Sequence, residues 1–181
     1  MITSRVSRRE FWLRMASVVA ASSTMSALLP AWLRAELPAA SPGELSSHAQ
    51  SIHQVITFDA PPARVYETLV DAAQFSAMTR FSTLPKAAPA RLAREEGATF
   101  ALFDGHIVGR NVELDPNRRI VQAWRAIDWE EGLYSIARFE LAGQQRTTLT
   151  FDHTGFPRGQ GTHLVEGWYA NYWTPMKKHL G

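Results

Sequence analysis

Residues 103–141 read FDGHIVGRNVELDPNRRIVQAWRAIDWEEGLYSIARFEL. Runs of apolar and polar residues alternate over 106–114, 119–127 and 133–141, and the turn sequences DPN and DWEEG separate them. Alternation with a period of two is typical of strands, and connections this short join antiparallel neighbours. The stretch therefore predicts consecutive strands of one antiparallel sheet.

Further strands are expected on both sides of this stretch. The run ATFALF (98–103) precedes the tight-turn pair Asp104-Gly105, and RTTLTFDHT (146–154) follows the turn AGQQ. Earlier in the chain, SIHQVITF (51–58) also alternates, and two prolines stop it. The expected order is a strand, short helices, about five or six antiparallel strands, and a final helix.

Helices are expected at 62–73 and 74–80 and at the C-terminus. Pro62 suits the first turn of a helix, and apolar residues follow it at helical spacing. The last segment, 162–180, has an apolar stripe, and Pro175 should kink or divide it. These elements predict an α+β fold in which a curved antiparallel sheet wraps around a long C-terminal helix. The space between sheet and helix is the natural place for a pocket.

The N-terminus has the pattern of an export signal. Arg8 and Arg9 stand side by side, and the run 15–33 that follows them carries no charge. Twin arginines before an apolar run indicate the twin-arginine export route. A membrane anchor and a buried helix are the alternatives, but serines and a proline make the run only modestly apolar. The expected divisions are a signal peptide (1–35), a flexible linker (36–50) and a domain (51–181), with a periplasmic or exported location and only transient membrane contact.

The charge of the chain changes sign when this segment is removed. The full chain carries 19 Lys and Arg against 17 Asp and Glu, a formal charge of +2. Residues 1–35 hold five arginines and one glutamate, which leaves 14 against 16, or −2. A domain of this charge gives no support to nucleic-acid binding. The chain has no cysteine, and its histidines show no metal-ligand spacing, so we predict no disulfide, metal or cofactor.

Inward-facing side chains supply the candidate site. A ligand cavity is predicted from Phe100, Leu102, Trp124, Phe139, Phe151, His153, Trp168 and Tyr172. Each aromatic side chain could equally be plain core, since aromatic residues usually bury their area for stability. His153 could orient a polar group of a ligand, but a catalytic histidine would need a carboxylate partner, and Asp152 points to the opposite face of the strand.

Several motifs resemble one family. They are Phe103-Asp104-Gly105, Gly109, Glu113-Leu114, Pro116, Trp124-Arg125, Trp129, Glu131-Gly132, Tyr134-Ser135, Phe139-Glu140-Leu141, Thr154-Gly155-Phe156-Pro157 and Glu166-Gly167-Trp168. Across residues 51–180 the chain resembles the activator of heat-shock protein 90 ATPase homologue (AHSA-like) family, in the START-like SRPBCC superfamily. The resemblance implies a helix-grip fold. It also implies either a cavity for lipids, sterols or polyketides, or a co-chaperone role.

Three functions follow as hypotheses. The first is an exported, non-enzymatic START-like domain that binds a small hydrophobic molecule. The second is a co-chaperone-like module with a protein partner, which an exported location opposes because the resemblance places that chaperone in the cytosol. The third is a cyclase or hydrolase on the same scaffold, for which the sequence offers no paired acid and base.

Overall fold

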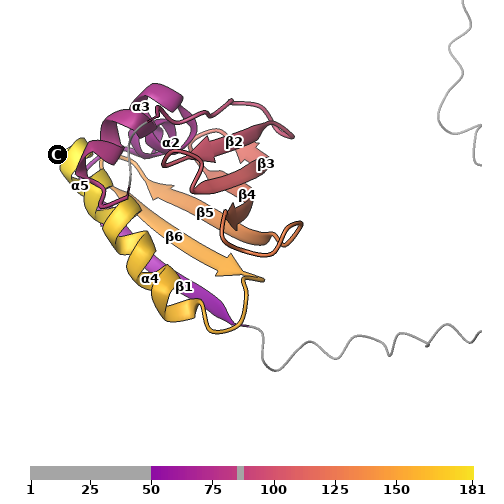
Figure 1. The fold of residues 1–181 in the computed structure, drawn as a ribbon. Coiled ribbons are helices and arrows are strands. Elements are labelled where there is room, and N and C mark those ends of the chain that lie inside the picture. The colour runs from indigo at the N-terminus through magenta and orange to yellow at the C-terminus, as the bar shows by residue number, and fades with distance from the viewer. Residues whose placement is uncertain (1–49, 85–87) are drawn as a thin grey trace, which may run out of the picture. The chain divides into compact units, whose positions relative to one another are not determined.

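The computed structural model describes residues 50–84 and 88–181. The expected signal peptide, with Arg8 and Arg9, and all of the linker except Gln50 lie outside the described residues. The six strands form one antiparallel sheet in the order β1-β6-β5-β4-β3-β2, as Figure 1 shows. They are β1 (Ser51–Phe58), β2 (Thr99–Leu102), β3 (Ile107–Asp115), β4 (Arg119–Ala126), β5 (Ser135–Gly143) and β6 (Thr147–Thr154). The α+β fold class predicted from the sequence is confirmed.

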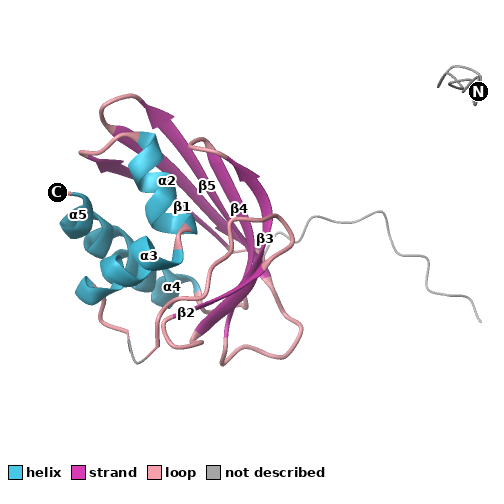
Figure 2. Cartoon of the chain, turned by 90° about the horizontal axis from the view of Figure 1, so that it is seen from above, coloured by secondary structure: helices cyan, strands magenta, loops and turns pink. Residues whose placement is uncertain are grey.

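The helices lie on one side of the sheet (Figure 2). They are α2 (Pro62–Val70), α3 (Ala72–Met78) with a 3₁₀ turn at Thr79–Phe81, α4 (Gly161–Trp168) and α5 (Thr174–Leu180). The helix α3 begins two residues before the expected position, because the Asp71 carboxylate caps it by accepting a hydrogen bond from the Gln74 amide at 2.9 Å.

The C-terminal helix continues through Pro175, but it is not a regular α-helix along its whole length. A π-helical segment, Tyr169–Trp173, joins α4 to α5, and Pro175 follows in the first turn of α5. Proline in a regular helix clashes with the carbonyl four residues earlier, and a π turn is one way to relieve such a clash. The predicted division is therefore a local widening of the helix rather than a break.

The core lies between the sheet and the helices, and strand alternation determines which side chains enter it. Along β1, buried and exposed residues alternate without exception. On β3, Gly109 leaves room for the ring of Phe100 from β2. A Cβ at Gly109 would lie 2.3 Å from Phe100 Cζ and 2.2 Å from the Ala123 carbonyl oxygen. Glycine at this position therefore allows β2 to pack a full aromatic ring into the core.

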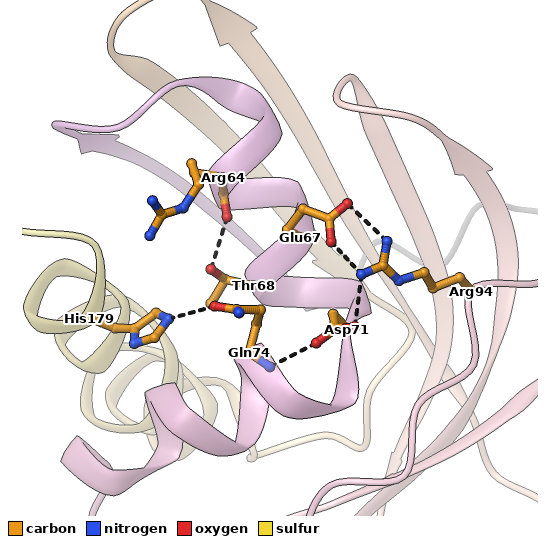
Figure 3. A network of polar contacts seen from close by, with 7 residues as sticks. All are labelled: Arg64, Glu67, Thr68, Asp71, Gln74, Arg94 and His179. Atoms are coloured by element: carbon orange, nitrogen blue, oxygen red, sulfur yellow. Dashed lines mark hydrogen bonds and ion pairs between the residues drawn. The ribbon is translucent and has the colours of Figure 1, made fainter.

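Polar contacts hold the segment before β2 against the helices (Figure 3). Arg94 forms ion pairs with Glu67 of α2 and, at 2.8 Å, with Asp71 between α2 and α3. Arg94 and the Gln74 amide together hold the pKa of Asp71 below its usual range. His179 of α5 joins the same group through Gln74 Oε1 at 3.2 Å. These contacts tie α2, α3 and α5 to the chain that leads into β2.

The face of the sheet opposite the helices is charged. His53 pairs with Asp152 at 2.7 Å, and Arg138 pairs with the same carboxylate at 2.9 Å. Asp152 thus points away from the core, as the strand alternation predicts. Within the described residues, no helix is both long and apolar enough to cross a membrane.

Candidate ligand-binding cavity

A cavity of about 300 Å³ lies beside α4 and the π-helical segment, on the helix side of the sheet. This volume is at the lower end of the range for small-molecule sites. The lining residues are Leu84, His106, Ile107, Trp124, Ala126, Asp128, Trp129, Gln160, His163, Leu164, Gly167, Trp168, Asn171 and Tyr172.

Four aromatic side chains form much of the cavity wall. The ring centroids of Trp124 and Trp129 are 5.4 Å apart, and those of Trp124 and Trp168 are 5.6 Å apart. Tyr172 continues the series at 4.2 Å from Trp168. All four are buried. Contacts at these distances support each ring against its neighbours.

A buried hydrogen-bonded chain fixes two of these tryptophans. Trp168 Nε1 donates to His153 Nδ1 at 3.1 Å, so the proton of a neutral ring is on Nε2. His153 Nε2 lies 2.7 Å from Ser135 Oγ, which in turn donates to the Trp124 carbonyl oxygen at 2.9 Å. Burial lowers the pKa of His153 to about 3. His153 is therefore a neutral connector between β4 and α4.

The loop after β4 brings Trp129 and Asp128 to the cavity. Arg125 holds this loop by donating to the backbone carbonyl oxygens of Trp129 at 2.5 Å and Glu130 at 3.3 Å. Trp129 is buried, whereas Asp128 is exposed. The loop thus supplies both an aromatic wall and a carboxylate to the same site.

Asn171 connects the π-helical segment to the chain that carries Leu84. Its Oδ1 accepts hydrogen bonds from the hydroxyls of Ser82 (2.7 Å) and Thr83 (2.9 Å), and from the amides of Thr83 and Leu84 (3.2 Å each). Its Nδ2 donates to the Gly167 carbonyl oxygen at 3.1 Å. One amide side chain therefore holds the Leu84 side of the cavity in place.

Two polar atoms of the cavity-lining residues have no hydrogen-bond partner in the described part of the chain. They are Trp124 Nε1 and the Tyr172 hydroxyl. Burial raises the pKa of Tyr172, and the indole N–H of Trp124 beside the hydroxyl opposes part of that rise. The tyrosine is accordingly a neutral donor at ordinary pH.

All eight predicted cavity residues are buried, but they divide into two groups. Trp124, Trp168 and Tyr172 line the cavity. The others belong to the packed core and do not line it; they are Phe100, Leu102, Phe139, Phe151 and His153. Ligand binding by any of the eight stays a prediction.

The sequence reading missed part of the cavity wall. Trp129 and Asp128 lie in the turn DWEEG, whose acidic residues predict exposure to solvent. The tryptophan is the one residue of this turn that favours burial, and it is buried in the structure. The cavity is also lined by His163 and Gly167 of α4 and by Asn171 of the π-helical segment. The apolar stripe of this C-terminal region predicts burial but does not distinguish a cavity wall from a filled core.

Two observations on the described residues concern metal binding and the candidate histidine His153. They contain no group of three or more His, Cys, Asp or Glu side chains that could hold a metal ion. The hydrogen-bond partners of His153 in this part of the chain are Ser135 and Trp168 rather than a carboxylate.

The chain is similar to known proteins over this domain. Residues 59–181 match the family described as "Activator of Hsp90 ATPase homolog 1-like protein". An uncharacterized protein of Schizosaccharomyces pombe is 35% identical over 72% of this chain and 37% of its own length. The activator of 90 kDa heat shock protein ATPase homolog of Dictyostelium discoideum is 30% identical over 63% of this chain and 28% of its own length.

The likeness extends to solved structures. The crystal structure of an HSP90 activator from Plasmodium falciparum superposes with a TM-score of 0.66 at 24% identity, over 72% of this chain and 96% of that one. The matched region covers 37% of the Schizosaccharomyces pombe protein and 28% of the Dictyostelium discoideum protein. This chain therefore spans only part of the length of both relatives. On the match over residues 59–181, the chain belongs to the family of activator of Hsp90 ATPase homolog 1-like proteins.

Proposed function

We propose that this domain binds a compact, largely apolar molecule in the cavity between the sheet and α4. The observation that carries the proposal is the aromatic wall of Trp124, Trp129, Trp168 and Tyr172 around about 300 Å³ of space. Apolar walls with a few polar groups are typical of small-molecule sites. Side chains used purely for stability would be expected to close such a space, because protein interiors pack to crystal-like density.

The polar groups of the cavity are unevenly distributed. His163 and Asp128 are exposed, whereas Trp124, Trp168 and Tyr172 are buried. An occupant with an apolar body and one polar end fits this arrangement, with its body against the rings and its polar end toward the exposed residues.

Gly167 offers a direct test of the cavity. It lies in α4, lines the cavity, and a Cβ built on it meets no atom within 4 Å. The substitution Gly167→Leu should therefore fill part of the cavity. It should also stabilise the helix by roughly 0.5–1 kcal/mol, because glycine is a poor helix former. We expect native mass spectrometry of protein recovered from its host to show a bound small molecule on the wild type and not on this variant.

Glu166→Leu is the matched control. It places the same side chain at the preceding position of α4, on an exposed residue that does not line the cavity. We expect it to retain the bound molecule. Equal occupancy in wild type and Gly167→Leu would contradict binding in this cavity.

We further propose that the mature domain acts after export by the twin-arginine route and without catalysis. The support for export is the pair Arg8-Arg9 before the uncharged run 15–33. The support for a non-enzymatic role is the neutral connecting position of His153, in contact with Ser135 and Trp168. A cyclase or hydrolase would need an acid and a base that act together at the cavity, and His153, the histidine considered for this role from the sequence, does not line it.

Family membership favours a second candidate, a protein-binding role. A curated relative is named as an activator of a heat-shock protein ATPase, and this chain matches 28% of its length. The test is to add the domain to the homologous chaperone from its own host and measure ATP hydrolysis. A raised rate, together with no small molecule in the cavity, would favour this candidate over the first.

A further inference from the structure

The residues that line the cavity bear on the charge of its ligand, an argument that rests on the proposed function. Three tryptophans and one tyrosine belong to the lining. Within residues 50–84 and 88–181, no lysine or arginine lines the cavity, and Asp128 is the single carboxylate that does. Aromatic ring faces are electron-rich and attract cations, and a carboxylate does the same. A lining of this composition therefore favours a positively charged ligand over a negatively charged one.

Asp128 is placed to meet that charge at the open side of the cavity. It is exposed, whereas the neighbouring Trp129 is buried, and both residues line the cavity. Within the described part of the chain, the Asp128 carboxylate takes part in no ion pair. A charge that is removed from water without a partner is strongly disfavoured. Beside an exposed carboxylate, a cationic group would keep part of its hydration and gain a counter-ion.

The other ionisable groups nearby leave Asp128 to set the sign of the charge. Arg125 holds the same loop, but it does not line the cavity, and its guanidinium donates to three backbone carbonyl oxygens of that loop. The lining also includes His106 and His163. At pH 8 an ordinary imidazole is uncharged, so measurements at that pH isolate the effect of the carboxylate.

We infer that the cavity selects a compact cationic amine, whose ammonium group lies beside Asp128 and whose apolar body lies against the aromatic wall. Trp129 contributes to this selection because it follows Asp128 directly and lines the same cavity. A cation within about 6 Å of a tryptophan ring centre is attracted to the face of the ring. A carboxylate of the same shape is rejected, because it would place a second negative charge beside Asp128.

Three probes that share one ring system test this inference: 2-naphthylmethylamine, 2-naphthylmethanol and 2-naphthoate. Their head groups are cationic, neutral and anionic at pH 8. Isothermal titration calorimetry on the purified protein at that pH gives the three dissociation constants. We expect the amine to bind about three- to tenfold more tightly than the alcohol, and at least about tenfold more tightly than the naphthoate. Equal or tighter binding of the alcohol or the naphthoate would overturn the inference.

The variant Asp128→Asn isolates the carboxylate. It keeps the shape of an exposed side chain and removes its charge, so the fold should be retained. We expect about a three- to fivefold loss of affinity for the amine and no change for the alcohol. Glu131→Gln removes the same charge from an exposed residue of the same loop that does not line the cavity. It should change the affinity for the amine by about twofold or less.

The outcomes separate this inference from the proposed function. Equal losses in Asp128→Asn and Glu131→Gln would mean that Asp128 does not contact the amine. Amine binding that persists in Gly167→Leu would place the amine outside the cavity and overturn the inference. If the three probes bind alike or none binds, the inference is wrong, while the proposed function still depends on whether native mass spectrometry finds a small molecule on the wild type and not on Gly167→Leu.

Discussion

His153 shows how one buried residue can hold a wall of the cavity in place without lining the cavity. It accepts from Trp168 and contacts Ser135, so it fixes an indole that lines the cavity. Protonation of Nδ1 would abolish its acceptor role, because an imidazolium has only donors. The ring must therefore stay neutral for this hydrogen bond between α4 and the sheet to persist.

The pH dependence of stability should report this requirement. The pKa of His153 is about 3 in the folded protein, against about 6.5 for an ordinary histidine. Below pH 6.5 the unfolded chain binds a proton that the folded chain does not, so stability present above that pH is lost as the pH falls toward 3. The expected loss from this group is about 1.4 kcal/mol per pH unit, or roughly 2 kcal/mol between pH 6.5 and 5.

Urea unfolding at pH 7, 6 and 5 measures this slope. The variant His153→Gln should be less stable at pH 7, since glutamine cannot reproduce the geometry of the ring, but its stability should fall less steeply with pH. Parallel slopes for the wild type and the variant would show that the pH dependence arises from other residues.

At the scale of elements, the strands could be predicted from sequence and the cavity only in part. Alternation in stretches such as SIHQVITF depends on local chemistry alone, and the six strands follow it closely. Whether Phe151 or Trp129 faces open space depends instead on contacts that strand alternation does not encode. Phe151 is covered by Trp168 at 4.3 Å, whereas the hydrogen bonds of Arg125 turn the Trp129 loop inward. Neither contact has a periodic signal in the sequence.

The π-helical segment and the chain at Ser82–Leu84 form a unit that depends on Asn171. Replacing Asn171 by leucine removes the shared acceptor of two hydroxyls and two backbone amides. We expect a loss of about 2 kcal/mol in the free energy of unfolding, because the buried Ser82 hydroxyl would lose its acceptor, and a donor buried without a partner costs about 1–3 kcal/mol. Chemical denaturation followed by circular dichroism measures this change.

Tyr169→Leu provides the comparison for that experiment. Tyr169 begins the same π-helical segment but is 48% exposed. Its replacement by leucine should change the free energy of unfolding by less than about 0.5 kcal/mol, as is usual for surface positions. Similar losses for the two variants would mean that Asn171 does not hold the Leu84 chain in place.

At the scale of the whole molecule, the location of the protein decides between the two candidate functions. The domain after residue 35 carries a formal charge of −2, while residues 1–35 contribute five arginines and one glutamate. The basic character of the chain therefore resides in the proposed export signal. An exported domain would be separated from a cytosolic chaperone, which would leave ligand binding as the stronger candidate.

Substitution of the paired arginines tests this proposal. We expect the native chain to reach the periplasmic fraction of its host with a new N-terminus between residues 36 and 41. The double variant Arg8→Lys/Arg9→Lys should stay in the cytoplasm at full mass, because the export receptor reads this pair rather than total charge. The double variant Arg5→Lys/Arg14→Lys makes the same chemical change in the same segment and should still be exported. Equal export of both variants would remove the twin-arginine assignment, and retention of the native chain in the cytoplasm would favour the protein-binding role.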